Sequence, residues 1–141
     1  MDTFIENLTF ELTIRSEKYN QIPLKFIIKI NDSICYGPTT LEGNKVQKCV
    51  GQKKLTTVKN NLCLEILDPL IIKNSWYSPD NTHLKILDVK LYGISLGLTP
   101  FQSTYYPLHD KPIPYGTLLG QAGKWIMPFE SPTVNYYDLI L

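Results

Sequence analysis

One segment, residues 73–82, combines large aromatic rings with oxygen-bearing side chains in a polar, proline-containing stretch. Trp76 and Tyr77 are costly in such a loop unless they cover something. Sugar rings stack on aromatic platforms of this kind, and Asp80 and Asn81 can contact sugar hydroxyls or a calcium ion. In the alternative interpretation the loop folds back on its own domain, with Trp76 as a structural anchor.

A second candidate surface is basic. Five lysines fall between residues 45 and 59, and no acidic residue lies between Glu42 and Glu65. Such a patch can meet phosphate or an acidic partner. No aromatic residues are interleaved with these lysines, which argues against a groove for single-stranded nucleic acid. The simpler interpretation is a hydrated strand edge that resists aggregation. The lysines are Lys45, Lys48, Lys53, Lys54 and Lys59.

Catalytic and metal-binding patterns are weak. The two histidines, His83 and His109, have no metal-ligand spacing, and the three cysteines include no CxxC pair. The cysteines predict neither a zinc site nor a disulfide framework. No glycine-rich phosphate loop follows a strand and opens a helix. We therefore expect no enzyme activity, no cofactor and no bound metal.

Composition points to one globular unit with no strong electrostatic field. Hydrophobic residues make up 43% of the 141 residues, and the formal net charge is +1. No nucleic-acid or membrane partner is expected from this balance. No stretch approaches the roughly 18 consecutive apolar residues of a membrane span. Because the N-terminus carries acid where a signal peptide carries basic residues, we expect synthesis in the cytosol without export by the usual route.

The elements that would position these residues are strands. Residues 8–15, 24–30 and 83–92 alternate apolar and polar side chains, and residues 55–58 and 62–67 predict a hairpin through residues 59–61. No window shows a helical apolar stripe. The sequence predicts an all-β, antiparallel β-sandwich of the jelly-roll-like kind. Its expected core is Leu8, Phe10, Leu12, Ile14, Phe26, Ile28, Leu64, Ile66, Leu87 and Val89.

The composition changes after Leu98. Residues 99–141 hold six of the ten prolines and eight of the sixteen aromatic residues. Dense proline disfavours helices and central strands, whereas a disordered linker would be poor in aromatics. The pattern predicts a sandwich domain over residues 1–98 and an extended arm over 99–141 that docks on another subunit. Truncation after Leu98 should then leave a folded sandwich. The expected assembly contacts are Tyr105, Tyr106, Trp125, Phe129, Tyr136 and Tyr137.

Two resemblances accompany these patterns. The first is to β-sandwich carbohydrate-binding modules. It rests on the run Leu62-Cys63-Leu64-Glu65-Ile66, the loop over residues 73–82, and the run from His83 to Ile94, which contains Gly93. They are similar to the ending "strand, acidic-polar loop, strand, glycine" of xylan-binding modules that use calcium. This resemblance implies a sandwich that binds a glycan with calcium assistance.

The segment from Gly120 to Pro132 resembles C-terminal segments of virion structural proteins from tailed phages that infect marine cyanobacteria. This resemblance implies a bacteriophage structural or assembly protein, such as a decoration, neck, tail or fibre component. Its partners would be other virion proteins or copies of itself, and it would be located in the virion after synthesis in the host cytoplasm. The sequence leaves two functions open, virion assembly through protein–protein contacts and carbohydrate binding.

Overall fold

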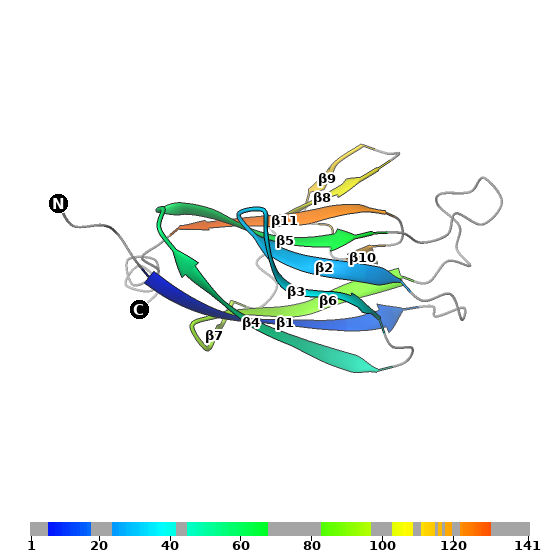
Figure 1. Ribbon diagram of the computed structural model, residues 1–141. Coiled ribbons are helices and arrows are strands. Elements are labelled where there is room, and N and C mark those ends of the chain that lie inside the picture. Colours follow the sequence, from blue (N-terminus) through cyan, green and yellow to red (C-terminus); the bar gives the residue numbers. More distant parts are fainter. Residues whose placement is uncertain are drawn as a thin grey trace.

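Two antiparallel sheets face each other in the computed structural model, which describes residues 6–17, 24–41, 45–67, 83–96, 103–108, 111–114, 116, 118–119 and 122–130 (Figure 1). Sheet A has the order β10-β6-β1-β4, with β7 paired to β6. Its strands are β1 (Glu6–Glu17), β4 (Val46–Leu55), β6 (His83–Leu91), β7 (Ile94–Ser95) and β10 (Leu118–Leu119).

Sheet B has the order β3-β2-β5-β11-β8-β9. Its strands are β2 (Lys25–Ile30), β3 (Ser33–Thr40), β5 (Lys59–Ile66), β8 (Thr104–Pro107), β9 (Ile113–Pro114) and β11 (Gly123–Glu130). The described part of the chain contains no helix, and therefore none long and apolar enough to span a membrane. The predicted all-β sandwich is confirmed.

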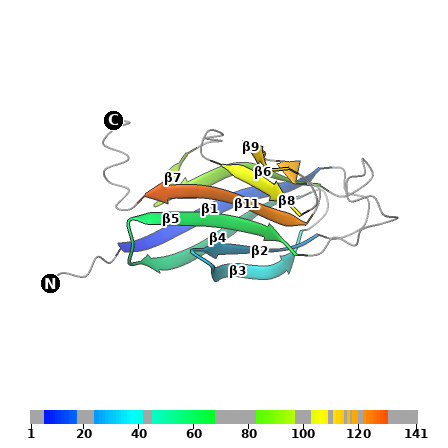
Figure 2. The same cartoon turned by 90° about the horizontal axis from the view of Figure 1, so that it is seen from above.

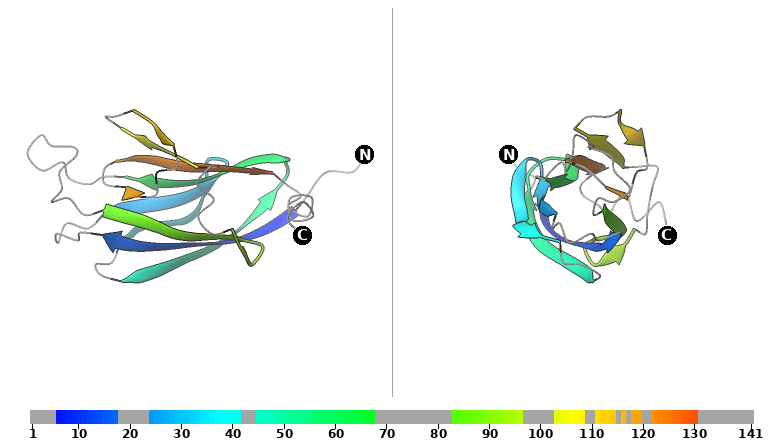
Figure 3. Two further views of the ribbon diagram at one scale, coloured as in Figure 1. Left: turned by 180° about the vertical axis from the view of Figure 1, so that it is seen from behind. Right: turned by 90° about the vertical axis from the view of Figure 1, so that its right-hand side faces the viewer.

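The core lies between the sheets, which curve around a common interior when viewed along the strands (Figure 3, right). Seen from above, sheet B covers sheet A along most of its length (Figure 2). Strict alternation in β1 sends Leu8, Phe10 and Leu12 inward, where each is at most 1% exposed. Their partners across the core include Phe26 and Ile28 of β2, both fully buried. The core residues predicted from β1, β2 and β5 are confirmed.

Leu87 differs from the prediction because β6 contains a bulge. The register between β1 and β6 shifts between Thr13 and Ile14, which adds one residue to β6. Ile86 and Val89 therefore both face the core, while Leu87 is only half-buried. The alternation of the sequence changes phase at this point.

The predicted hairpin is wrong, because β4 lies in sheet A and β5 in sheet B and the two strands do not pair. The chain crosses from one sheet to the other at this turn. The turn occupies residues 56–58, and β5 already begins at Lys59. Asn60, 2% exposed, fixes this turn: its side-chain amide donates to the carbonyl oxygens of Thr57 and Val58, each at 3.1 Å. The lysine-rich stretch before the turn is β4, which pairs only with β1 among the described strands. The prediction that these lysines mark a strand edge is confirmed.

The predicted C-terminal arm is wrong for the described residues between 104 and 130, because β8, β9, β10 and β11 are strands of the two sheets. β11 lies between β5 and β8 in sheet B (Figures 1 and 2). Trp125 and Tyr105 are each 2% exposed in the core of this chain, so they are not available to another subunit. Phe129 is half-buried against the core, and only Tyr106, 45% exposed, remains on the surface. The other two expected assembly contacts, Tyr136 and Tyr137, lie outside the described residues.

Proline in β11 is compatible with this position. Among the described residues β8 pairs with β11 only as far as Ile126, so no described strand lies beside Pro128 on that edge. A residue without an amide hydrogen is accommodated there without loss of a ladder hydrogen bond on that edge.

Candidate functional site

The aromatic loop predicted to bind a ligand cannot be placed. Trp76, Tyr77, Asp80 and Asn81 all lie outside the described residues. The candidate site that the structure does describe is the outer face of sheet A. It consists of the side chains of β1 and β4 that point away from the core, together with their neighbours on β6 and β7. On β1 and β4 these are Asn7, Thr9, Glu11, Thr13, Arg15, Val46, Lys48, Val50, Gln52 and Lys54.

A polar hollow of about 430 Å³ lies at one end of this face. Asn7 is opposite Lys54 and Thr9 is opposite Gln52 in the β1–β4 ladder, so two amides, a hydroxyl and an ammonium group form a block across the two strands. Lys53 also lines the hollow. Cavities of several hundred cubic ångströms suit small ligands, and a lining of this composition suits a ligand rich in hydroxyl or anionic oxygens.

The hollow was not predicted from the sequence. The alternation of residues 8–15 places Thr9 on the outward face, but it does not show that Gln52 is the residue opposite. That pairing follows from the long β1–β4 register, in which Phe10 packs over Gly51. A Cβ atom on Gly51 would lie 2.6 Å from the Phe10 ring, so only glycine fits under it.

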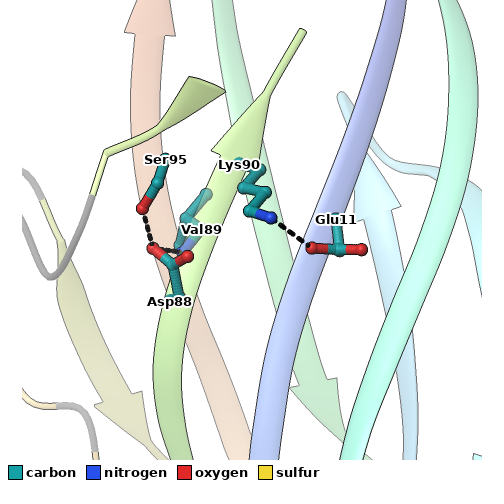
Figure 4. Close-up of polar contacts among 5 residues, drawn as sticks. All are labelled: Glu11, Asp88, Val89, Lys90 and Ser95. Atoms are coloured by element: carbon teal, nitrogen blue, oxygen red, sulfur yellow. Dashed lines mark hydrogen bonds and ion pairs between the residues drawn. The ribbon is translucent and has the colours of Figure 1, made fainter. Parts of the chain in front are cut away.

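Two acidic side chains of the same face are engaged within the sheet (Figure 4). Lys90 Nζ lies 3.3 Å from Glu11 Oε2. Asp88 Oδ1 accepts hydrogen bonds from the Val89 backbone N–H at 2.8 Å and from Ser95 Oγ at 2.7 Å. The bulge in β6 contributes to this arrangement, because Asp88 directly follows the extra residue. These contacts hold both carboxylates in place and, at Glu11, offset the negative charge.

Two lysines, Lys48 and Lys54, lie on the β4 side of the same face, and both are exposed. Lys53 is opposite Leu8 in the ladder, so it points to the other side of the sheet, where it is half-exposed. None of the three has an ion pair with another described residue. The outer face of β4 therefore carries two positive charges, at Lys48 and Lys54, that no acidic side chain of the described residues neutralises.

Carboxylates, the charged ligands that calcium prefers, do not cluster in the described part of the chain. No group of three or more His, Cys, Asp or Glu side chains in the described part of the chain could hold a metal ion. Asp88 already uses one carboxylate oxygen within the sheet. A calcium site that used Asp80 and Asn81 would lie outside the described residues.

The thiols are also poor candidates for chemistry. Burial raises the pKa of Cys49 to about 11, against a smaller opposite effect of its hydrogen bond with Tyr36. Burial likewise raises the pKa of Cys63 to about 11, and Glu65 adds to the shift. Both thiols are protonated near neutral pH and are weak nucleophiles. Cys35, Cys49 and Cys63 are all free thiols.

Known proteins resemble this chain in structure but not in sequence. No protein-family model and no curated protein matches it. A solved structure of "vCBM60 in complex with galactobiose" has a TM-score of 0.51 at 9% identity and covers 86% of this chain and 97% of that one. A selenomethionine form of vCBM60 has a TM-score of 0.57 at 8% identity and covers 85% of this chain and 89% of that one. Its title describes a circular permutation linking two families of calcium-dependent carbohydrate binding modules. This chain has the β-sandwich fold of these carbohydrate-binding modules.

Proposed function

We propose that this chain is a non-catalytic carbohydrate-binding domain. The observation that carries the proposal is the fold, which it shares with the two vCBM60 structures over nearly their whole length. One of those structures holds galactobiose. A polar, hollowed strand surface supports the same function, because sugar hydroxyls are recognised by side-chain amides, hydroxyls and charged groups.

Two places on the chain can bind the glycan under this proposal. The first is the loop over residues 73–82, in which Trp76 and Tyr77 would stack on sugar rings while Asp80 and Asn81 contact hydroxyls or a calcium ion. The second is the outer face of sheet A with its hollow. The first depends on aromatic stacking, whereas the second depends on hydrogen bonds and charge.

The test is a binding screen with the full chain against a panel of soluble polysaccharides, by affinity electrophoresis and then by titration calorimetry. We expect retardation by at least one polysaccharide. A Trp76→Ala, Tyr77→Ala double variant then reports on the loop, and a Thr9→Ala, Gln52→Ala double variant reports on the hollow. Whichever variant loses binding with an unchanged melting temperature identifies the site. Failure of every polysaccharide to bind the wild-type chain would refute the proposed function.

The second candidate function is assembly through protein–protein contacts, as in a phage virion component. The observation that favours it is the exposed apolar surface at the β8–β9 hairpin, which projects from the sandwich (Figure 1). Tyr106, Leu108 and Ile113 are 45%, 65% and 43% exposed there. Ile113 is opposite Tyr105 in the ladder and so lies on the other face of the hairpin from Tyr106. Exposed apolar side chains on a projecting hairpin are still typical of interaction sites. Light scattering after size-exclusion chromatography tests this function, and a strict monomer at high concentration would count against self-assembly.

A further inference from the structure

We propose that the outer face of sheet A binds acidic polysaccharide, with the β4 lysines contacting the carboxylate or sulfate groups of the sugar chain. This inference rests on the proposed carbohydrate-binding function and specifies its ligand class. It joins two observations, a polar hollow between β1 and β4 and two lysines on the same face of β4, Lys48 and Lys54, that have no acidic partner among the described residues.

The charge argument begins with the partners of each ionised group. Glu11 is paired with Lys90, and Asp88 is held by the Val89 N–H and Ser95 Oγ. Lys48 and Lys54, the two lysines of β4 on this face, have no acidic partner among the described residues. A ligand with acidic groups would form ion pairs with these lysines, whereas a neutral glycan would form none.

The geometry suits an extended chain rather than a single small anion. Lys48 and Lys54 lie on the same side of β4, six residues apart, which corresponds to roughly 20 Å along the strand. The hollow with its amide and hydroxyl groups occupies the Lys54 end of this stretch. A polysaccharide with regularly spaced acidic groups can place one sugar unit in the hollow and its neighbours along the strand.

Nucleic acid carries comparable charge but fits this face less well. Single-stranded nucleic acid is held by aromatic side chains on which the bases stack. The outward-facing side chains of β1 and β4 are polar, charged or aliphatic, and none is aromatic. The amide and hydroxyl groups of the hollow match sugar hydroxyls better than they match stacked bases.

The experiment compares the wild-type chain with two charge-reversed double variants. Lys48→Glu with Lys54→Glu changes the proposed face. Lys25→Glu with Lys124→Glu makes the same change in net charge on exposed lysines of sheet B and serves as the matched control. Each protein is titrated with polygalacturonate and dextran sulfate as acidic probes, with neutral galactan and xylan, and with a single-stranded oligonucleotide. Circular dichroism and melting temperature check that both variants are folded.

We expect the acidic probes to bind the wild-type chain more tightly than the neutral ones. The Lys48, Lys54 variant should lose at least about tenfold in affinity, while the control variant stays within about twofold. Added salt should weaken binding, because the Debye length falls from about 10 Å at 0.1 M to about 3 Å at 1 M. Binding should survive EDTA, because the lysines contact the anions directly.

Other results overturn the inference in distinguishable ways. If only the neutral glycans bind, or if both variants lose affinity equally, the carbohydrate-binding function stands and the acidic-ligand inference fails. Loss of binding in EDTA also refutes the inference, in favour of a calcium-dependent site elsewhere. Equal or tighter binding of the oligonucleotide refutes it in favour of nucleic acid. If neither acidic nor neutral polysaccharide binds, the proposed function itself fails.

Discussion

Tyr105 and Tyr106 are adjacent residues of the same type on β8 that face opposite sides of sheet B. Tyr105 points into the core and is 2% exposed, whereas Tyr106 is 45% exposed on the outer face. Replacing each by alanine removes the same atoms from two different environments. The pair therefore separates a structural role in this chain from a role at an interface with another subunit.

The expected magnitudes follow from the buried area. An aromatic side chain buries about 150–250 Å², which at about 25 cal/mol per Å² corresponds to roughly 4–6 kcal/mol. Residual compactness of the unfolded chain reduces this to about 3–5 kcal/mol, in line with aromatic-to-alanine substitutions in cores. Tyr105→Ala should therefore lower the free energy of unfolding by about 3–5 kcal/mol. Tyr106→Ala should lower it by less than about 2 kcal/mol, because nearly half of that side chain is already in water.

Urea denaturation followed by far-UV circular dichroism measures both values, and thermal melts provide a second readout. With roughly 3–6 °C per kcal/mol for a domain of this size, Tyr105→Ala should melt at least about 10 °C below the wild type. Equal destabilisation by the two substitutions would refute the reasoning. A fully stable Tyr105→Ala variant that changed only its oligomeric state would restore Tyr105 as an assembly contact.

Three further outcomes are expected. Gly51→Ala should cost about 1–3 kcal/mol in urea denaturation, since its Cβ would lie 2.6 Å from the Phe10 ring, and a neutral result would show that the ring moves freely. The hydrogen bond from Lys29 to Glu65 raises the pKa of Lys29 above 10.5, so the pair's contribution is complete below that pH and is lost as pH rises through the folded-state pKa. Because both side chains are about one-fifth exposed, the ion pair contributes under about 1 kcal/mol to the free energy of unfolding. Urea midpoints measured from below to above pH 10.5 should show this loss in the wild-type chain and not in Glu65→Gln. Burial raises the pKa of Cys63 to about 11, so its alkylation rate, followed by peptide mass spectrometry, should rise about tenfold per pH unit from pH 8 to 10, and a plateau by pH 9 would contradict this.

The first half of the fold was predictable because its signals are local. The period of two in β1 and β2 reports which side of each strand is buried, and this holds wherever a strand is regular. The bulge at Leu87 escaped prediction because an inserted residue changes the phase without changing the residue types. The turn at residues 56–58 depends on Asn60, whose side-chain hydrogen bonds are not visible in the spacing of apolar residues.

The C-terminal strands were missed for a different reason. Trp125, Met127 and Phe129 alternate with outward-facing residues, as is typical of a strand. Pro128, however, argues against a central strand, because proline has no amide hydrogen for the ladder. The edge beside Pro128, where no described strand pairs with β11, depends on how far β8 extends. The candidate site was missed because its hollow is made by the register between β1 and β4. Pairing between distant segments leaves little trace in one sequence.

The position of β11 sets the order in which this chain can be completed during synthesis. β11 fills the space between β5 and β8, yet it comes after both of them along the chain. When β1 to β6 of a nascent chain have left the ribosome, the core still lacks Trp125. Sheet B still lacks β11, the strand that joins β5 to β8. The edge of β5 and part of the core stay open until residues 123–130 emerge, which exposes strand edges and apolar surface to aggregation. Slow translation late in the message would prolong that exposure, whereas slow translation before β5 would not.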